Sequence, residues 1–372
     1  MLDVWAVDPG RVRRGQLEVL SCSVVVRDAD IGAWTVTVQD DDLARRVGAG
    51  WRVVIRDDTG VVTSGPVLEY GGDVADGAFT FSGEDDLFHV ASRVTFPDPS
   101  MPAEQQTDAA YFKYSAVASN VIDRLLYRNV GSGSIEARHV PGFVLDVAGG
   151  GNLGSTVTVN TRYKNLLEEA RSLARVGGVT FWAVQGDDSD LIRFRFREPV
   201  DLSRRVRFSL GGGGLTGGSW ALTAPTVTSV LVAGQGQGTD RTIKEHLASP
   251  GEWGFRIEQF QDRRDTDDPK ELEQAGTDTL AEGAAGGSAV VEVEEAPGLV
   301  FGVDFRLGDT VLVDFGRAQI TEPVRAVELV YDGYGRSAKL TLGDHATDED
   351  QDPAWVKHVR ALGKRLRGLE TI

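Results

Sequence analysis

The residue types that most often carry catalysis are present in this sequence without the spacing that a site needs. The five histidines follow no metal-ligand pattern, and no Gly-x-Ser-x-Gly segment or Cys–His pair predicts a nucleophile. The histidines are His89, His139, His246, His345 and His358. Neighbouring acids are common in a chain with 56 acidic residues, so pairs such as Glu168 and Glu169 do not indicate a glycosidase. We therefore expect that the protein is not an enzyme.

Three further segments could hold a ligand, and each lacks an essential feature. The run 234–239 (GQGQGT) follows a predicted strand, but its third glycine comes one position too early for a dinucleotide fingerprint and no βαβ unit follows. The acid-rich segments 187–190 and 262–268 lack the central glycine and closing glutamate of a calcium loop. The sequence thus predicts no cofactor and no dedicated metal site.

Composition and charge restrict the class of protein. Hydrophobic residues make up 41% of the chain, and its 45 glycines favour a soluble, β-rich fold with many turns. A net charge of −17 argues against tight nucleic-acid binding over a broad face, although not against a surface that nucleic acid passes without adhering. The single cysteine, Cys22, excludes an internal disulfide. With no signal peptide or long apolar run, we expect a soluble protein made in a cytoplasm.

The segment 307–344 has the clearest pattern of predicted strands in the sequence. Three stretches rich in Val, Leu and Thr alternate apolar with polar residues and are separated by glycine-containing breaks, which predicts an antiparallel meander. A similar order of glycine and proline occurs near the N-terminus: 50–57 matches 308–314, and Pro66 matches Pro323. Residues 78–85 match 338–345 in the same alignment. We interpret these as two copies of one β module; the alternative is the general likeness of any two meanders.

Between the copies the pattern is different. Apolar residues at three- and four-residue steps predict a helix over 108–129, and Asn165 with Glu168 predicts the capped start of a second helix that ends at Gly177-Gly178. Residues 179–184 and 191–198 predict a hairpin. A helix packed on a hairpin makes an α+β insert.

The C-terminal segment has a heptad pattern. Its apolar residues repeat at four- and three-residue steps, as in a coiled coil, after an acidic stretch. They are Trp355, Val359, Leu362, Leu366 and Leu369. Two heptads are too short to be stable alone, so we expect them to associate where subunits are already held together. The alternative is a helix packed on its own domain.

These observations predict a mainly β protein with an α+β insert and a C-terminal helix. The expected parts are a first tube-like β-barrel at 1–97 (completed, in one version, by 204–235), an α+β middle domain at 98–203, a second tube-like β-barrel at 204–346 with a helical insertion near 268–282, and an acidic linker with the heptad helix at 347–372.

The chain resembles the tail-hub, or tail-associated, proteins of long-tailed bacteriophages, which are similar to baseplate hubs of contractile phages and to spike hubs of type VI secretion systems. The resemblance rests on patterns of strand and turn residues in four segments: 50–55 with 83–97, 165–198, 227–234, and 308–313 with 340–344.

This resemblance implies a structural role. In such proteins three subunits contribute two tube-like barrels each, so that six modules continue a hexameric tail tube and give DNA a channel toward the host. It implies a homotrimer in the virion tail tip or baseplate, with the tail tube or distal tail protein and fibre, spike or receptor-binding proteins as partners. Residues 98–205 would lie outside, and DNA would pass an acidic lumen without sequence-specific binding. The chain ends at Ile372 without a hydrolase or fibre domain, so we expect no lytic activity.

Two other functional classes remain alternatives. The seven tryptophans could form stacking platforms of a carbohydrate-binding or carbohydrate-active β protein. They are Trp5, Trp34, Trp51, Trp182, Trp220, Trp253 and Trp355. A host-surface adhesin would instead bind cells through the central insert.

Overall fold

Strands dominate the protein, because apolar and polar residues alternate through most of its length. The computed structural model describes residues 2–73, 77–106, 110–145, 151–186, 190–211, 213–249, 251–264, 266–333 and 335–343. The N-terminal strands are β1 (Asp3–Val7), β2 (Arg13–Gln16), β3 (Val19–Arg27), β4 (Asp30–Gln39), β5 (Arg52–Asp57), β6 (Gly60–Asp73) and β7 (Ala78–Glu84).

The middle segment, defined here as residues 85–198, mixes helices and strands. Its elements are α1 (Phe88–Ala91), β8 (Phe112–Val117), α2 (Ala118–Asn129), β9 (Phe143–Leu145), β10 (Thr156–Thr161), α3 (Leu166–Gly177), β11 (Thr180–Gln185) and β12 (Ile192–Arg197). The C-terminal strands are β13 (Arg207–Ser209), β14 (Leu215–Thr223), β18 (Gly286–Val293), β19 (Thr310–Asp314), β20 (Gln319–Asp332) and β21 (Gly335–Leu342). Between β14 and β18 lie β15 (Ser229–Ala233), β16 (Ile243–Leu247), β17 (Glu258–Asp262) and α4 (Pro269–Glu282).

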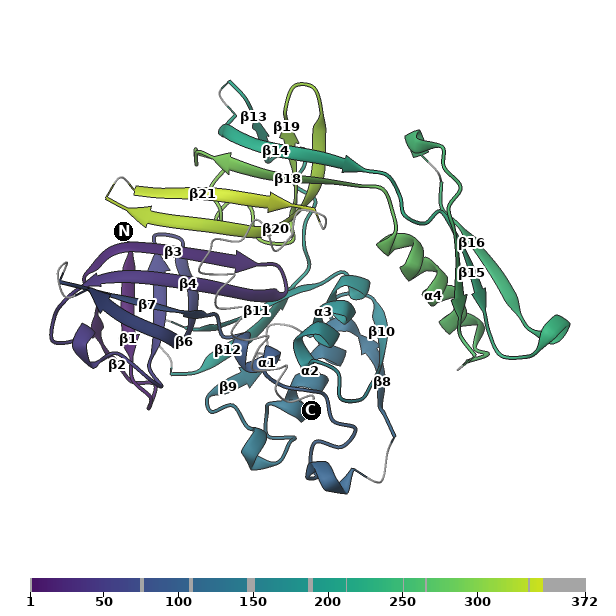
Figure 1. The fold of residues 1–372 in the computed structure, drawn as a ribbon, viewed down its shortest axis with the longest axis horizontal. Coiled ribbons are helices and arrows are strands. Elements are labelled where there is room, and N and C mark those ends of the chain that lie inside the picture. Colours follow the sequence, from purple (N-terminus) through teal and green to yellow (C-terminus); the bar gives the residue numbers. More distant parts are fainter. Residues whose placement is uncertain are drawn as a thin grey trace.

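The largest sheet runs through both ends of the chain. Its strand order is β14-β18-β21-β20-β3-β4-β7-β6-β5-β1-β2, with β13 and β19 attached through β20 (Figure 1). The expectation of two separate closed barrels therefore differs from the structure: in the described residues the path is open and the two strand groups are joined. We call the antiparallel β20–β3 pairing, which places Val327 opposite Val26, the joint.

The predicted repeat is confirmed by strand pairing. We call β3–β7 the first module and β14 with β18–β21 the second module. In the first, Arg52 lies opposite Pro66, and in the second Thr310 lies opposite Pro323. Beyond each proline the register with the next strand shifts at the same place, between residues 67 and 69 and between residues 324 and 326. Shared register and shared bulges identify two copies of one backbone plan.

The repeat also includes the preceding strands. In β3 the register with β4 shifts between Val19 and Ser21, and in β14 the register with β18 shifts between Leu215 and Gly217. β3-β4-β7-β6 therefore corresponds to β14-β18-β21-β20.

The expected alignment of the third strands is wrong by one residue. Phe81 lies opposite Tyr70, and Leu340 lies opposite Val327, so Phe81 and Leu340 are equivalent. The alignment that matches the glycines at 83 and 343 makes Phe81 equivalent to Thr341 instead. A one-residue slip would turn every side chain to the other face, and the buried Phe81 and Leu340 fix the true register.

One hydrophobic core serves both modules. It contains Trp34, Phe81, Val291 and Leu340, which are completely or almost completely inaccessible to solvent. These side chains lie on one face of the large sheet, as the alternation along each strand requires.

The middle segment has a second core, built on α2, α3 and the β11–β12 hairpin. Asn165 caps α3 by accepting hydrogen bonds from the N–H groups of Leu167 and Glu168, and Gly178 ends it with a left-handed φ of 70°. The predicted helix over 108–129 is wrong in its first half. Residues 112–117 form β8, which pairs with β10, because that partner outweighs the local helical spacing.

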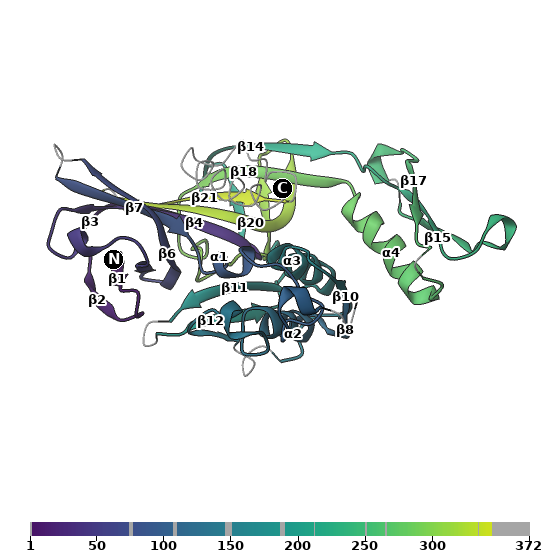
Figure 2. The ribbon, with the colours of Figure 1, turned by 60° about the horizontal axis from the view of Figure 1, so that its bottom comes forward.

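The lobe, residues 226–285, projects from the second module (Figure 2). In it α4 packs on the three-stranded sheet β16-β15-β17 and begins at the cap Asp268, which accepts from Lys270 N–H at 2.8 Å. This agrees with the helical insertion predicted near 268–282. None of the helices in the described residues is long and apolar enough to cross a membrane.

Candidate assembly surface

A buried polar cluster fastens the two modules beside the joint. Asp57, at the end of β5, accepts hydrogen bonds from the Tyr331 hydroxyl at 2.8 Å and from Arg336 Nη1 at 2.7 Å. Its other oxygen accepts from the N–H and hydroxyl of Thr59. Arg336 also forms an ion pair with Glu295 at 3.1 Å. Burial and, less strongly, the adjacent Asp57 raise the pKa of Tyr331. The cluster therefore links the modules through groups that satisfy one another.

A cleft of about 630 Å³ lies next to this cluster. Its lining includes Leu17, Val19, Asp57, Tyr331 and Arg336, and it contains no tryptophan. Among the acids of the lining, Asp57 is held by the Tyr331 hydroxyl and by Arg336, and Glu18, Asp58 and Asp332 also line the cleft.

Asp28, at the end of β3, connects three parts of the chain. Its carboxylate accepts from Arg325 of the second module and from the Thr180 hydroxyl of the middle segment. Its backbone N–H donates to the Arg325 carbonyl at 2.8 Å. The side chain of Asp28 is only 8% exposed, so removing it would delete the buried acceptor that Arg325 and the Thr180 hydroxyl share.

A second buried cluster joins the first module to the middle segment. Arg52 donates to both oxygens of Asp86, at 2.6 and 2.8 Å, and the Ser64 hydroxyl donates to the same carboxylate at 2.5 Å. Ser64 in turn accepts from the N–H of Gln185 at 2.7 Å. Burial raises the pKa of the neighbouring Asp85 to about 8, although N–H groups donate to its carboxylate. The segment 83–97, which is part of the family resemblance, thus contains a structural anchor.

The second module is fastened to the middle segment by a different contact. Arg197, at the end of β12, donates to Asp309 at 2.8 Å. The same oxygen of Asp309 accepts from the N–H of Val200, and the other accepts from the N–H of Arg306. The middle segment is therefore held to both modules by buried or half-buried ion pairs.

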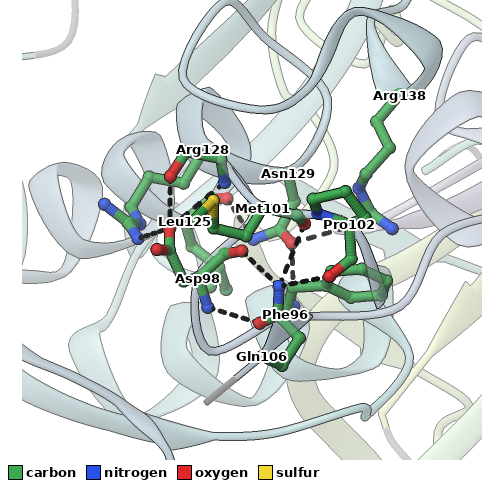
Figure 3. Close-up of polar contacts among 10 residues, drawn as sticks. Phe96, Asp98, Met101, Pro102, Gln106, Leu125, Arg128, Asn129 and Arg138 are labelled. Carbon is green, nitrogen blue, oxygen red and sulfur yellow. Dashed lines mark hydrogen bonds and ion pairs between the residues drawn. The ribbon is translucent and has the colours of Figure 1, made fainter. Parts of the chain in front are cut away.

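Polar side chains also shape the outer end of the middle segment, shown in Figure 3. Asn129 Oδ1 accepts from Phe96 N–H at 3.0 Å, while its Nδ2 donates to the Leu125 carbonyl. Gln106 accepts from Asp98 N–H at 2.8 Å and donates to the Met101 carbonyl at 3.0 Å. These amides bond to backbone groups, so the cluster fixes the loop 96–106 on α2 and presents no group arranged for catalysis.

The face of the large sheet opposite the core has a distinct composition. Many residues that alternate with the core along the strands are small hydroxyl residues such as Ser23, Thr35 and Thr80, while Val25 and Ala33 form a small buried apolar cluster on the same face. One cross-strand row places Lys339 between Glu292 and Glu328. This face is therefore polar, with two acids for one base in that row.

The described residues that the sequence analysis considered as catalytic, metal-binding or sugar-stacking candidates do not form a cluster. Within the described parts of the chain, no group of three or more His, Cys, Asp or Glu side chains could hold a metal. His139 contacts the Ser134 carbonyl, and His246 lies 3.9 Å from Glu273 in the lobe. Trp34 is fully buried, whereas Trp220 and Trp253 are exposed on separate elements.

Two of the three candidate ligand segments, 234–239 and 262–268, form structural contacts instead. The carbonyl of Gly234 accepts from Arg241 at 2.8 Å. Asp262 pairs with Arg241 and Arg264, and Asp268 caps α4. Parts of the acidic turn 187–190 lie outside the described residues, as do His345, His358 and the heptad residues Trp355, Val359, Leu362, Leu366 and Leu369.

The clusters around Asp57, Asp28 and Asp86 were not found from the sequence. They lie among 56 acids, and no local spacing distinguishes a buried acid from an exposed one. The only signal was indirect: Asp86 belongs to the segment 83–97, on which the family resemblance partly rests.

The comparisons with known proteins agree with this architecture. The profile of a family described as Siphovirus ReqiPepy6 Gp37-like protein matches residues 1–344. A 43 kDa tail protein of prophage MuSo2 from Shewanella oneidensis has a similar fold, with a TM-score of 0.58 at 12% identity over 93% of this chain and 99% of that one. A search of curated proteins gives no match.

Two further crystal structures have the same fold. The tail protein from Neisseria meningitidis MC58 has a TM-score of 0.58 at 11% identity, over 93% of this chain and 97% of that one. The prophage tail protein gp18 from Listeria monocytogenes has a TM-score of 0.57 at 11% identity, over 98% and 99%. The resemblance to phage tail proteins is thereby confirmed.

Proposed function

The chain belongs to the Siphovirus ReqiPepy6 Gp37-like protein family, and on that premise we propose that it is a structural hub subunit of a phage tail tip or baseplate, located in the virion. Membership of this family and the shared fold of three phage tail proteins support a structural tail role.

Three chains form a ring in this proposal. The observation that carries it is the repeat of one backbone plan, with the same registers and bulges, in two modules joined edge to edge. Two modules in each of three chains give six similar units, which match the symmetry of a hexameric tail tube. The barrels expected from the sequence would then be completed by the assembly, since a single chain leaves its sheet open.

The polar face of the large sheet lines the channel in this ring. The opposite face is buried in the core, so only this face is available to a lumen. Its hydroxyl residues offer no cationic surface, and Glu292 and Glu328 flank Lys339. Because like charges repel, phosphate groups of passing DNA would slide along such a wall and not adhere.

The partners follow from this position. The tail tube or distal tail protein would contact one end of the ring, and fibre, spike or receptor-binding proteins the other. The heptad residues 355–369 would associate on the threefold axis, and the middle segment would brace the outside.

The mass of the purified chain tests the ring. Light scattering should give three times the mass of one chain, either directly or after addition of tail components, and end-on electron micrographs should show a central opening. A stable dimer would contradict the proposal.

The lumen is tested by DNA binding. At about 50 mM salt, where phosphate contacts are strongest, the protein should not retard a short duplex. The double variant Glu292→Lys, Glu328→Lys should bind it, and binding should weaken as salt is raised. Retardation by the unaltered protein at that salt concentration would rule out a non-adhesive channel.

Release of sugars from a cell-wall preparation would favour the carbohydrate-active alternative.

A further inference from the structure

The large sheet of one chain ends at two unpaired edges. β14 pairs with β18 on one side, and residues 67–73 of β6 pair with β7 on one side. No other described strand pairs with either of them; β5 pairs with the earlier part of β6, residues 60–66. Figure 1 shows β14 at one end of the stacked strands and β6 toward the other.

These edges are the counterparts of the two strands that form the joint. The repeat relates β6 to β20 and β14 to β3, and β20 and β3 pair with each other inside the chain. In the joint, the second module contributes β20 and the first contributes β3. Their counterparts are free: β6, the equivalent of β20, in the first module, and β14, the equivalent of β3, in the second.

Burial at equivalent positions shows what the free edges lack. In the joint, Val327 and Val24 are inaccessible and Val26 is 9% exposed. The equivalent of Val327 is Tyr70, which is 56% exposed, and the equivalent of Val26 is Leu222, which is 52% exposed. Large apolar side chains stand in solvent at the same places where the joint buries valines.

We propose that β6 of one chain pairs with β14 of a second copy of this chain, antiparallel and in the register of the joint. This rests on the proposed ring, and it adds the residues that form each contact between chains. The occupant is a second copy because this chain itself supplies both complementary edges and shows, in the joint, how they fit.

The register follows from the joint pair by pair. Val327 opposite Val26 becomes Tyr70 opposite Leu222, and Leu329 opposite Val24 becomes Gly72 opposite Trp220.

The chemistry of the edges permits this pairing. Lysine and proline are the residues that commonly block a sheet edge. Neither occurs in residues 67–73 (VLEYGGD) or 215–223 (LTGGSWALT). Antiparallel pairing would satisfy the outward backbone groups of both strands and cover Tyr70 and Leu222.

Cysteine crosslinking tests the register. The double variant Tyr70→Cys, Leu222→Cys, oxidised as the full-length protein, should give disulfide-linked species of two and three chains and none larger on a non-reducing gel. The natural Cys22 will not compete, since it is buried and its pKa is raised to about 12. Both substituted positions are exposed in the single chain, so folding is retained.

Two controls define the geometry. Val26→Cys with Val327→Cys has the same register within one chain and should form a disulfide without linking chains. Tyr70→Cys with Ala221→Cys is displaced by one residue, so the thiols would face opposite sides of the sheet and should not link. Linking by this displaced pair in place of Tyr70–Leu222 would overturn the register.

Blocking one edge provides a second test. Leu222→Asp should leave a folded monomer by circular dichroism and light scattering. Leu247→Asp, at an equally exposed leucine in the lobe, should leave assembly unchanged. A trimer of Leu222→Asp would overturn the pairing.

The outcomes separate this inference from the ring itself. A trimeric mass without Tyr70–Leu222 crosslinks refutes the pairing and leaves the ring intact. Crosslinks that continue beyond three chains, or stop at two, support the pairing and refute the threefold ring.

Discussion

The two modules share their strand registers and bulges, but different side chains hold them in place. In the first, Arg52 opposite Pro66 forms a buried ion pair with Asp86. At the same position in the second, Thr310 lies opposite Pro323, and the module is fastened through Asp309 and Arg197 instead. The repeat is therefore preserved in backbone pairing and in the buried face, while the anchors to the middle segment were free to differ.

Removing the anchor of the first module should have the largest effect. Asp86→Ala leaves the buried Arg52 without its partner, and we expect a loss of about 3–5 kcal/mol in the free energy of unfolding. Guanidinium denaturation measures it. Asp42→Ala, at a fully exposed ion pair, is the control and should change stability by less than about 1 kcal/mol. Equal effects of the two variants would show that the Arg52–Asp86 pair does not anchor the first module.

Equivalent core positions should respond alike. Phe81→Ala and Leu340→Ala each remove a fully buried side chain from the shared core, so each should cost about 2–5 kcal/mol. Because the core is continuous, urea denaturation should show one transition, shifted in both variants. A separate transition for either module would break the comparison; Glu18→Ala, on the exposed surface, should leave the curve unchanged.

The covered and free edges should respond differently. Val26→Ala in the joint should cost about 2 kcal/mol, because two methyl groups leave a packed site. Leu222→Ala, its counterpart on the free edge, should change the stability of the dilute monomer by at most about 0.5 kcal/mol. Thermal unfolding at a concentration where light scattering gives single chains measures both. A large loss for Leu222→Ala in the monomer would mean that this edge is already covered within the chain.

The smallest expected effect concerns a locally encoded element of the middle segment. Asn165→Ala removes the acceptor at the start of α3 and should cost about 1 kcal/mol. Asn165→Asp keeps that acceptor and should retain most of the stability, apart from the bond that Asn165 Nδ2 donates to the Ala91 carbonyl. Chemical denaturation distinguishes the two, and an Ala variant as stable as the parent would contradict the capping role.

Elements that depend on near neighbours were predicted well. The start and end of α3, the β11–β12 hairpin and α4 lie where the sequence places them, because caps, glycines and apolar spacing act within a few residues. Residues 112–117 show the limit of such patterns. Their spacing fits a helix, but Val159 and its neighbours in β10 provide a paired strand far along the chain.

The assembly surface was predicted only in outline. The repeat was visible in the order of glycine and proline, but equating the glycines at 83 and 343 shifted the third strand by one residue. The buried acids Asp28, Asp57 and Asp86 had no distinguishing signal, since an acid becomes an anchor only when its arginine arrives from another part of the chain.

By itself, the sequence determined the β-rich class, the doubled module and the local helices of the insert. Alternation along a strand specifies which face is buried, and turn residues specify where the strand ends. Neither specifies which strand lies alongside. That β20 pairs with β3, so that the two modules form one open sheet with complementary ends, was decided only in the tertiary structure, where backbone hydrogen bonds join residues from opposite ends of the chain.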